Sequence, residues 1–126
     1  MTGHPRLSLT FAVAVLLAGL LAGPAAARPF MIDVADGGLK YSPKTAHVNK
    51  GKKIKWTNKG SSTHTVNFYK KPSGSNIKSF SLSAGSSKKR TPDKAGTYKY
   101  RCLIGTHSDL DQGQCTGMCG KLRIHT

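Results

Sequence analysis

The strongest constraint on the fold of this chain is a repeated alternation of apolar and polar residues. In residues 53–57 (KIKWT), Ile54 and Trp56 fall on one side and the polar residues on the other, and residues 98–102 (YKYRC) alternate in a similar way. Successive side chains of a β-strand point to opposite faces, so this period indicates strands with one buried face. No stretch shows the pattern of a convincing amphipathic helix. We therefore predict an all-β protein.

The predicted strands are short and regularly spaced. Clusters of Gly, Pro, Ser and Asn separate them, as expected for turns. They cover residues 30–34, 40–48 with an interruption at Pro43, 53–57, 63–68, 77–82, 88–91, 97–102 and 121–124. Seven to eight short strands with this spacing predict a β-sandwich with Greek-key connections. Residues 108–114 are interpreted as a loop in which a short turn of helix is possible.

The first 27 residues have the organisation of a cleaved secretory signal peptide. Arg6 supplies the positive start, residues 9–21 form an apolar core, and residues 25–27 (AAA) form a small-residue cleavage site. The apolar core is short for a membrane span and is followed by Gly23-Pro24. We predict export to the periplasm or the extracellular space, no membrane anchor after cleavage, and one folded domain over residues 28–126.

The chain is strongly basic, with 20 Lys and Arg against 5 acidic residues, all of them Asp. Two basic runs stand out, one formed by Lys50, Lys52, Lys53 and Lys55 and the other by residues 88–90 (KKR). Such a charge favours acidic partner proteins or anionic envelope polymers. Nucleic acid would be the default partner of this charge inside a cell, but the predicted export argues against it. A solvated basic surface without a partner remains the alternative.

Four side chains suggest a metal site in the second half of the chain. Cys102 ends a predicted strand, His107 follows five residues later, Met118 lies in a glycine-rich segment, and His64 lies in an upstream strand. Each residue alone would be explained as part of a core or a surface. Together, two imidazoles, one thiolate and a weak thioether are the ligands of an electron-transfer copper site. We predict one copper ion per chain, cycling between Cu(II) and Cu(I). His47 and His125 lack this context, and His4 belongs to the N-terminal segment.

The order of several motifs resembles the cupredoxins, the small type 1 blue copper proteins of the plastocyanin and azurin kind. These motifs are residues 41–43 (YSP), 49–58 (NKGKKIKWTN), 96–102 (GTYKYRC), 117–118 (GM) and 120–124 (GKLRI), together with His64. The resemblance covers most of residues 28–126. It implies an eight-stranded Greek-key sandwich with copper near one end. It also implies His64, Cys102 and His107 as equatorial ligands, Met118 as the axial ligand, and His107 as the exit for the electron near the surface.

One departure from that pattern concerns the axial ligand. Ten residues separate His107 from Met118, whereas the family has a shorter gap. The additional residues form an inserted loop beside the metal. Gln112, Gln114 or a backbone carbonyl could then replace Met118, because glutamine and carbonyl oxygen also serve as axial ligands. The glycine-rich segment around Met118 favours the methionine.

The odd number of cysteines leaves one thiol for a special role. The simplest partition pairs Cys115 with Cys119 and leaves Cys102 free, and an oxidising compartment would favour that bridge. The alternative is a soft cluster of Cys115, Met118 and Cys119 that holds Cu(I) in passing.

We interpret the chain as an exported, monomeric copper protein that carries single electrons between redox partner proteins. The sequence has no nucleophile–base pattern, no pair of carboxylates suited to acid–base catalysis and no second histidine cluster. Nothing in it therefore indicates an enzyme. Two alternatives stay open. The first is a copper carrier or buffer that uses the same ligands. The second is a basic module with structural zinc bound by Cys102, His107, Cys115 and Cys119.

Overall fold

The computed structural model describes residue 3 and residues 28–126. The predicted signal peptide, apart from Gly3, lies outside the described residues, so its cleavage stays a prediction. Within the described part of the chain, no helix has the length and apolar character needed to cross a membrane.

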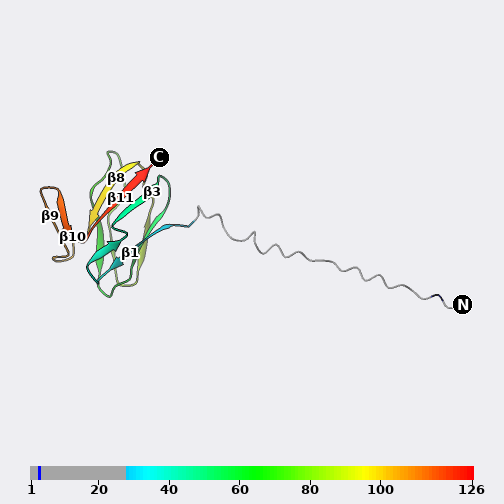
Figure 1. Cartoon of the computed structure of the whole chain (residues 1–126), viewed down its shortest axis with the longest axis horizontal. Coiled ribbons are helices and arrows are strands. Elements are labelled where there is room, and N and C mark those ends of the chain that lie inside the picture. The colour runs from blue at the N-terminus through cyan, green and yellow to red at the C-terminus, as the bar shows by residue number, and fades with distance from the viewer. Residues whose placement is uncertain (1–2, 4–27) are drawn as a thin grey trace.

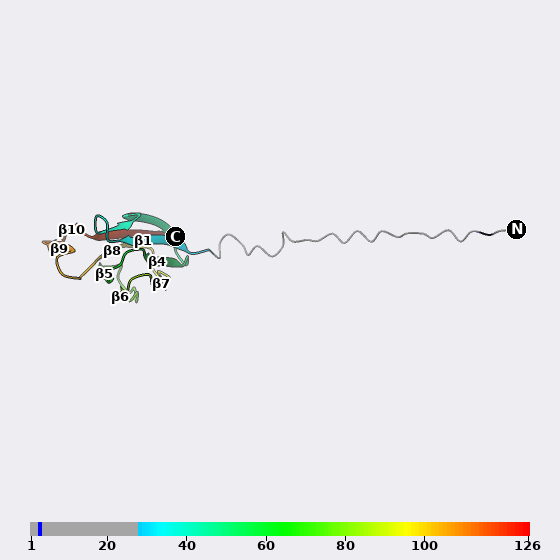
Figure 2. The same ribbon diagram turned by 90° about the horizontal axis from the view of Figure 1, so that it is seen from below.

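Eleven strands form two packed sheets and a separate hairpin (Figures 1 and 2). The first sheet has the order β2-β1-β4-β7, and the second has the order β3-β11-β8-β5-β6. The hairpin consists of β9 and β10. The strands are β1 (Phe30–Ala35), β2 (Lys40–Ser42), β3 (Thr45–Asn49), β4 (Ile54–Asn58), β5 (His64–Lys70), β6 (Phe80–Leu82), β7 (Ser87–Arg90), β8 (Gly96–Arg101), β9 (Ser108–Asp111), β10 (Gln114–Gly117) and β11 (Cys119–His125). The predicted all-β sandwich is confirmed.

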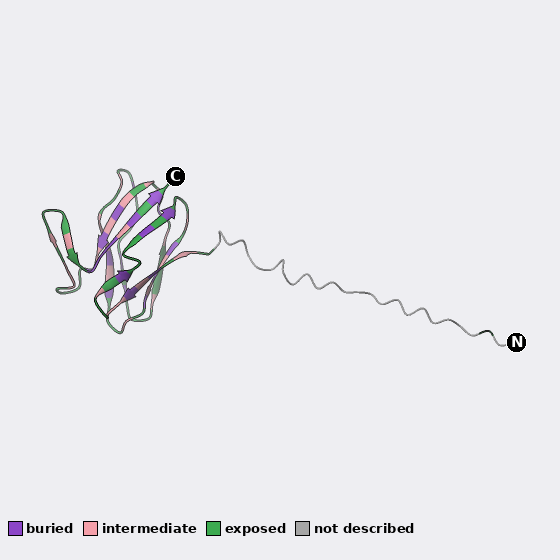
Figure 3. Ribbon diagram, viewed as in Figure 1, coloured by how far each residue is buried: buried purple, intermediate pink, exposed green. Residues whose placement is uncertain are grey.

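The core lies between the two sheets, where the inward residues of each strand meet. Trp56 of β4 is fully buried, and its ring packs edge-on against Phe68, Phe80 and Tyr100 with centroids 5.3–6.1 Å apart. Burial alternates along the sandwich strands, as Figure 3 shows, with Tyr98 and Tyr100 buried and the intervening Lys99 partly exposed. The alternation in the sequence thus identifies the face that each strand buries.

The predicted interruption at Pro43 marks a change of sheet. β2 pairs with β1 in the first sheet, and β3 pairs in parallel with β11 in the second. A proline cannot donate to a strand ladder, so it suits the short link between two edge strands. The same segment brings Lys44 beside β11, where its carbonyl accepts a hydrogen bond from the Lys121 amide (2.8 Å).

The interpretation of residues 108–114 as a loop with a turn of helix is wrong, because these residues form the β9–β10 hairpin instead. The two residues of the turn, Gln112 and Gly113, have φ of 48° and 77°, as a tight hairpin turn requires. The hairpin extends beyond the end of the sandwich in both views, and its residues are exposed or partly exposed (Figures 1–3). It also raises the strand count above the seven to eight predicted.

Gly120 of β11 leaves room for the ring of Tyr100, its direct cross-strand partner on β8. A Cβ atom at this position would overlap the Tyr100 ring, whereas a Cβ at Gly37 would meet nothing. We expect Gly120→Ala to lower the free energy of unfolding by about 1–3 kcal/mol, because forced overpacking displaces a buried ring. Denaturant unfolding of the metal-free protein measures this loss. Gly37→Ala is the control, and an equal effect of both changes would contradict the packing argument.

Candidate metal centre

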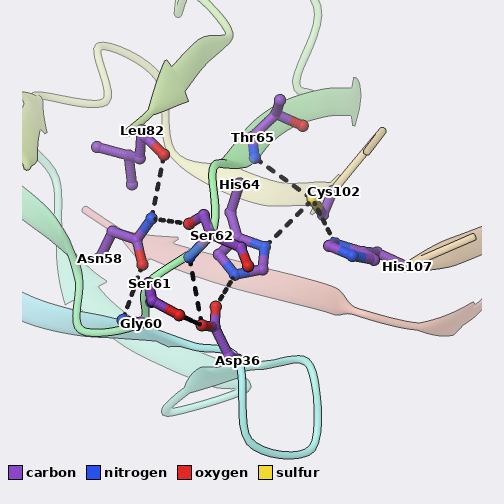
Figure 4. A network of polar contacts seen from close by, with 10 residues as sticks. All are labelled: Asp36, Asn58, Gly60, Ser61, Ser62, His64, Thr65, Leu82, Cys102 and His107. Carbon is purple, nitrogen blue, oxygen red and sulfur yellow. Dashed lines mark hydrogen bonds and ion pairs between the residues drawn. The ribbon is translucent and has the colours of Figure 1, made fainter. Parts of the chain in front are cut away.

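Three of the predicted ligands meet at one end of the sandwich (Figure 4). His64 is the first residue of β5, Cys102 follows β8, and His107 lies in the turn before β9. The Cys102 sulfur lies 3.7 Å from Nδ1 of His64 and 3.5 Å from Nδ1 of His107. His64 and Cys102 are fully buried, while His107 is partly exposed. Within the described residues, no other group of three such ligands comes together.

The spacing of these donors suits a metal ion. Bonds of about 2.0–2.3 Å to nitrogen and sulfur, in a trigonal plane, would separate each nitrogen from the sulfur by roughly 3.7 Å. The two sulfur–nitrogen distances of 3.7 and 3.5 Å are close to that value. A thiolate with two imidazoles is a donor set that copper accepts in both oxidation states. The residues present therefore fit a copper ion.

Hydrogen bonds from neighbouring strands fix the Cys102 segment. The Thr65 amide donates to the Cys102 sulfur (3.4 Å), and the Thr65 hydroxyl accepts from the Leu103 amide (2.8 Å). The Ser108 hydroxyl donates to the Cys102 carbonyl (2.5 Å). The sulfur therefore sits in a framework that restrains its movement.

Met118 is fully buried and lies between the two ligand-bearing segments. Its amide donates to the His107 carbonyl (2.8 Å), and its own carbonyl accepts from the Cys102 amide (3.2 Å). Gly117 makes this approach possible, because it has φ of 84° and a Cβ there would come within 2.5 Å of the His107 oxygen. The alternative axial residues Gln112 and Gln114 are both exposed on the hairpin.

The outer side of the His64 ring contacts Asp36, a residue to which the sequence analysis gave no role at the site. Nε2 of His64 lies 2.5 Å from Oδ1 of Asp36 (Figure 4). The hydrogen bond with His64, followed by the bonds from Ser61 and Ser62, lowers the pKa of Asp36 to about 2. The carboxyl group is therefore ionised at neutral pH.

Asn58 is a second residue that sequence reasoning missed. Its buried side chain donates to the carbonyls of Ser62 (2.7 Å) and Leu82 (3.1 Å) and accepts from the Gly60 amide (2.9 Å). These bonds fix the loop that leads from β4 into His64. An asparagine at the end of an alternating strand is the only sequence signal for this role.

The cysteines pair as the sequence suggested. Cys115 and Cys119 form a disulfide, and Cys102 is free and buried. Two of the four ligands of the zinc alternative are therefore not available as thiolates. The same bridge removes the thiols from the cluster proposed for Cu(I) transfer.

A basic pocket of about 200 Å³ lies on the outer face of the second sheet, beside the disulfide. Lys44, Lys99 and Lys121 line it together with Tyr69 and Gln114, and we call it the lysine pocket. Lys99 lies directly opposite Lys121 on the neighbouring strand. Like charges so placed repel each other, and no carboxylate in the described residues pairs with them.

Comparisons with known proteins agree with this geometry. Residues 29–125 match the copper binding proteins of the plastocyanin/azurin family. Chloroplast plastocyanin from Silene latifolia subsp. alba is 29% identical over 121 residues, which cover 89% of this chain and 68% of that protein. A purple cupredoxin from Nitrosopumilus maritimus is similar in fold (TM-score 0.58, 19% identity, covering 75% of this chain and 98% of that one). So is a proline-to-phenylalanine mutant of amicyanin in its reduced state (TM-score 0.58, 24% identity, 77% and 82%). The chain belongs to the plastocyanin/azurin family of copper-binding proteins.

Proposed function

We propose that this protein is an exported type 1 copper protein that carries single electrons. His64, Cys102 and His107 would hold the copper, and Met118 would be the fourth ligand. The observation that carries the proposal is the convergence of two Nδ1 atoms on one buried sulfur at 3.5–3.7 Å. The family match supports the choice of copper.

The arrangement of the ligands suits rapid electron transfer. Copper bound there would supply reversible one-electron chemistry between Cu(II) and Cu(I). His64 and Cys102 are fully buried and are restrained by Asp36 and Thr65, so the donors need to move little when the charge changes. His107 is the partly exposed ligand and would form the route by which an electron enters and leaves.

Titration of the protein with Cu(II), followed by visible absorption, tests this proposal. We expect an intense blue thiolate-to-copper band that saturates at one equivalent. A green-shifted band would keep the site but indicate a different axial ligand. Absence of any band, with tight zinc binding instead, would overturn the proposal.

We propose export and an oxidising compartment for the same protein. The Cys115–Cys119 disulfide supports this, since such bridges persist outside the cytoplasm. The disulfide also argues against a copper carrier, which would need free thiols at these positions. We propose no enzymatic activity, because the described residues supply one metal-binding group and a reductase or oxidase of this kind needs further metal centres.

We propose that the redox partners are acidic proteins that dock on the second sheet beside the lysine pocket. The pocket is connected to the metal site through the chain, because Cys119, which lines the pocket, is the residue directly after Met118. The outer face of β8 and β11 adds Arg101 and Arg123 to the lysines. The negatively charged surface of a partner protein would offset the repulsion among these lysines and arginines. The same attraction would bring the partner toward the copper end of the sandwich.

A charge-matched pair of double variants tests the location of this docking surface. We expect Lys99→Gln/Lys121→Gln to slow oxidation of the reduced protein by anionic hexacyanoferrate(III) about threefold or more at low salt. Lys55→Gln/Lys89→Gln removes an equivalent cross-strand pair from the first sheet and should have a smaller effect. Stopped-flow rates measure both, and added salt should abolish the difference. Equal rates for the two double variants would contradict the assignment.

A further inference from the structure

We propose that Asp36 is a positioning residue that fixes the tautomer of His64 and strengthens it as a ligand, so that the site favours oxidised copper. This inference rests on the proposed function, because it treats His64 as a copper ligand. It is carried by a carboxylate that contacts the buried imidazole on the side opposite to Cys102 (Figure 4).

Asp36 is held in place by its second oxygen. Oδ2 accepts hydrogen bonds from the Ser61 amide (2.6 Å), the Ser61 hydroxyl (3.1 Å) and the Ser62 amide (3.3 Å). These donors leave Oδ1 directed at Nε2 of His64, at 2.5 Å. The carboxylate thus bridges the loop before β5 and the imidazole at the start of β5.

This arrangement determines which nitrogen of His64 carries the proton. An ionised carboxylate can only accept hydrogen bonds, so Nε2 must be the protonated nitrogen. In the neutral ring Nδ1 then keeps its lone pair, and it faces the Cys102 sulfur at 3.7 Å. The ring is fully buried, so its pairing with Asp36 rather than solvent sets the tautomer. The metal-binding nitrogen is therefore available before any metal enters.

The negative charge of Asp36 also affects the balance between oxidation states. A carboxylate hydrogen-bonded to the outer nitrogen of a ligand imidazole raises the basicity of that ligand. A stronger, more electron-rich donor stabilises the more highly charged Cu(II) ion over Cu(I). In the described part of the chain, no carboxylate contacts the His107 ring, so the two imidazoles differ in this respect.

The surrounding loop is shaped to admit the carboxylate. A Cβ at Gly60 would overlap the carboxyl group of Asp36. The Gly60 amide is held by the Asn58 side chain (2.9 Å), which also anchors Ser62. A glycine and a buried asparagine therefore maintain the space that Asp36 occupies, independently of the contact with His64.

The test compares Asp36→Asn with Asp33→Asn. Both changes remove one negative charge from the N-terminal part of the chain, but Asp33 has no contact with His64. The three donors from Ser61 and Ser62 should attract the asparagine oxygen and turn its NH₂ group toward Nε2. His64 would then have to accept at Nε2 and carry its proton on Nδ1, facing Cys102.

Two measurements follow this change. Nitrogen-15 NMR of the metal-free protein should show His64 protonated at Nε2 in the wild type and at Nδ1 in Asp36→Asn. In the copper-loaded protein, the preference for Cu(II) over Cu(I) should fall about tenfold or more relative to Asp33→Asn, which corresponds to a rise in reduction potential of about 59 mV or more. If either signal failed to move, the proposal would be overturned.

Two further results keep the test decisive. If Asp36→Asn does not fold, Asp36→Ala removes the charge without offering a donor, and its potential should still rise above that of Asp33→Asn. If the wild type forms no blue site, the ligand assignment fails, while the NMR measurement on the metal-free protein still decides whether Asp36 sets the tautomer of His64.

Discussion

Replacement of Cys102 by serine is expected to abolish the blue absorption completely. The band arises from charge transfer between a thiolate and copper, and Cys102 is the one free cysteine among the described residues. A serine hydroxyl is nearly the same size, so the buried site should remain packed. It is a hard and weakly acidic donor, however, and would bind copper poorly in either oxidation state. The visible spectrum at one equivalent of Cu(II) measures the loss.

The control for this experiment is the double variant Cys115→Ser/Cys119→Ser. It removes the disulfide and leaves Cys102 in place, so the blue band should persist. A Cys102→Ser protein that kept its colour would show that another thiol or another site binds the copper. Loss of colour in the double variant alone would revive the carrier function of the loop cysteines.

The features that sequence reasoning predicted well depend on local patterns. The alternation around Trp56 and Tyr100 identified the strands and their buried faces, because a strand with one buried face carries its own period. The spacing of Cys102 and His107 placed two donors in one turn at the end of β8. In both cases the information lies within a few residues.

The features that sequence reasoning missed depend on contacts between distant residues. Asp36 and His64 are 28 positions apart, and only the pairing of β1 with β4 brings their loops together. The facing of Lys99 and Lys121 likewise depends on the register between β8 and β11. The β9–β10 hairpin was missed because its alternating residues include a single apolar side chain, Leu110, in β9, which is too weak a signal to oppose a loop interpretation.

Replacement of Met118 by leucine should leave copper bound and raise its reduction potential. Leucine fills a similar buried volume, so the backbone bonds to Cys102 and His107 should remain. The axial ligand and the polarity around the site tune its potential. Loss of electron donation and a more apolar site should both favour the less highly charged Cu(I). We expect the preference for Cu(II) to fall about tenfold or more, which corresponds to a rise of about 59 mV or more.

The matched control for Met118→Leu is Gln114→Leu, which removes one of the two rival glutamines on the exposed hairpin. Cyclic voltammetry of the two copper-loaded variants separates Met118 from Gln114. A shift in the methionine variant alone supports Met118, since this side chain is buried between the segments that carry Cys102 and His107. A shift in the glutamine variant alone would mean that the hairpin folds over the metal in the loaded protein and that the long insertion changes the axial ligand.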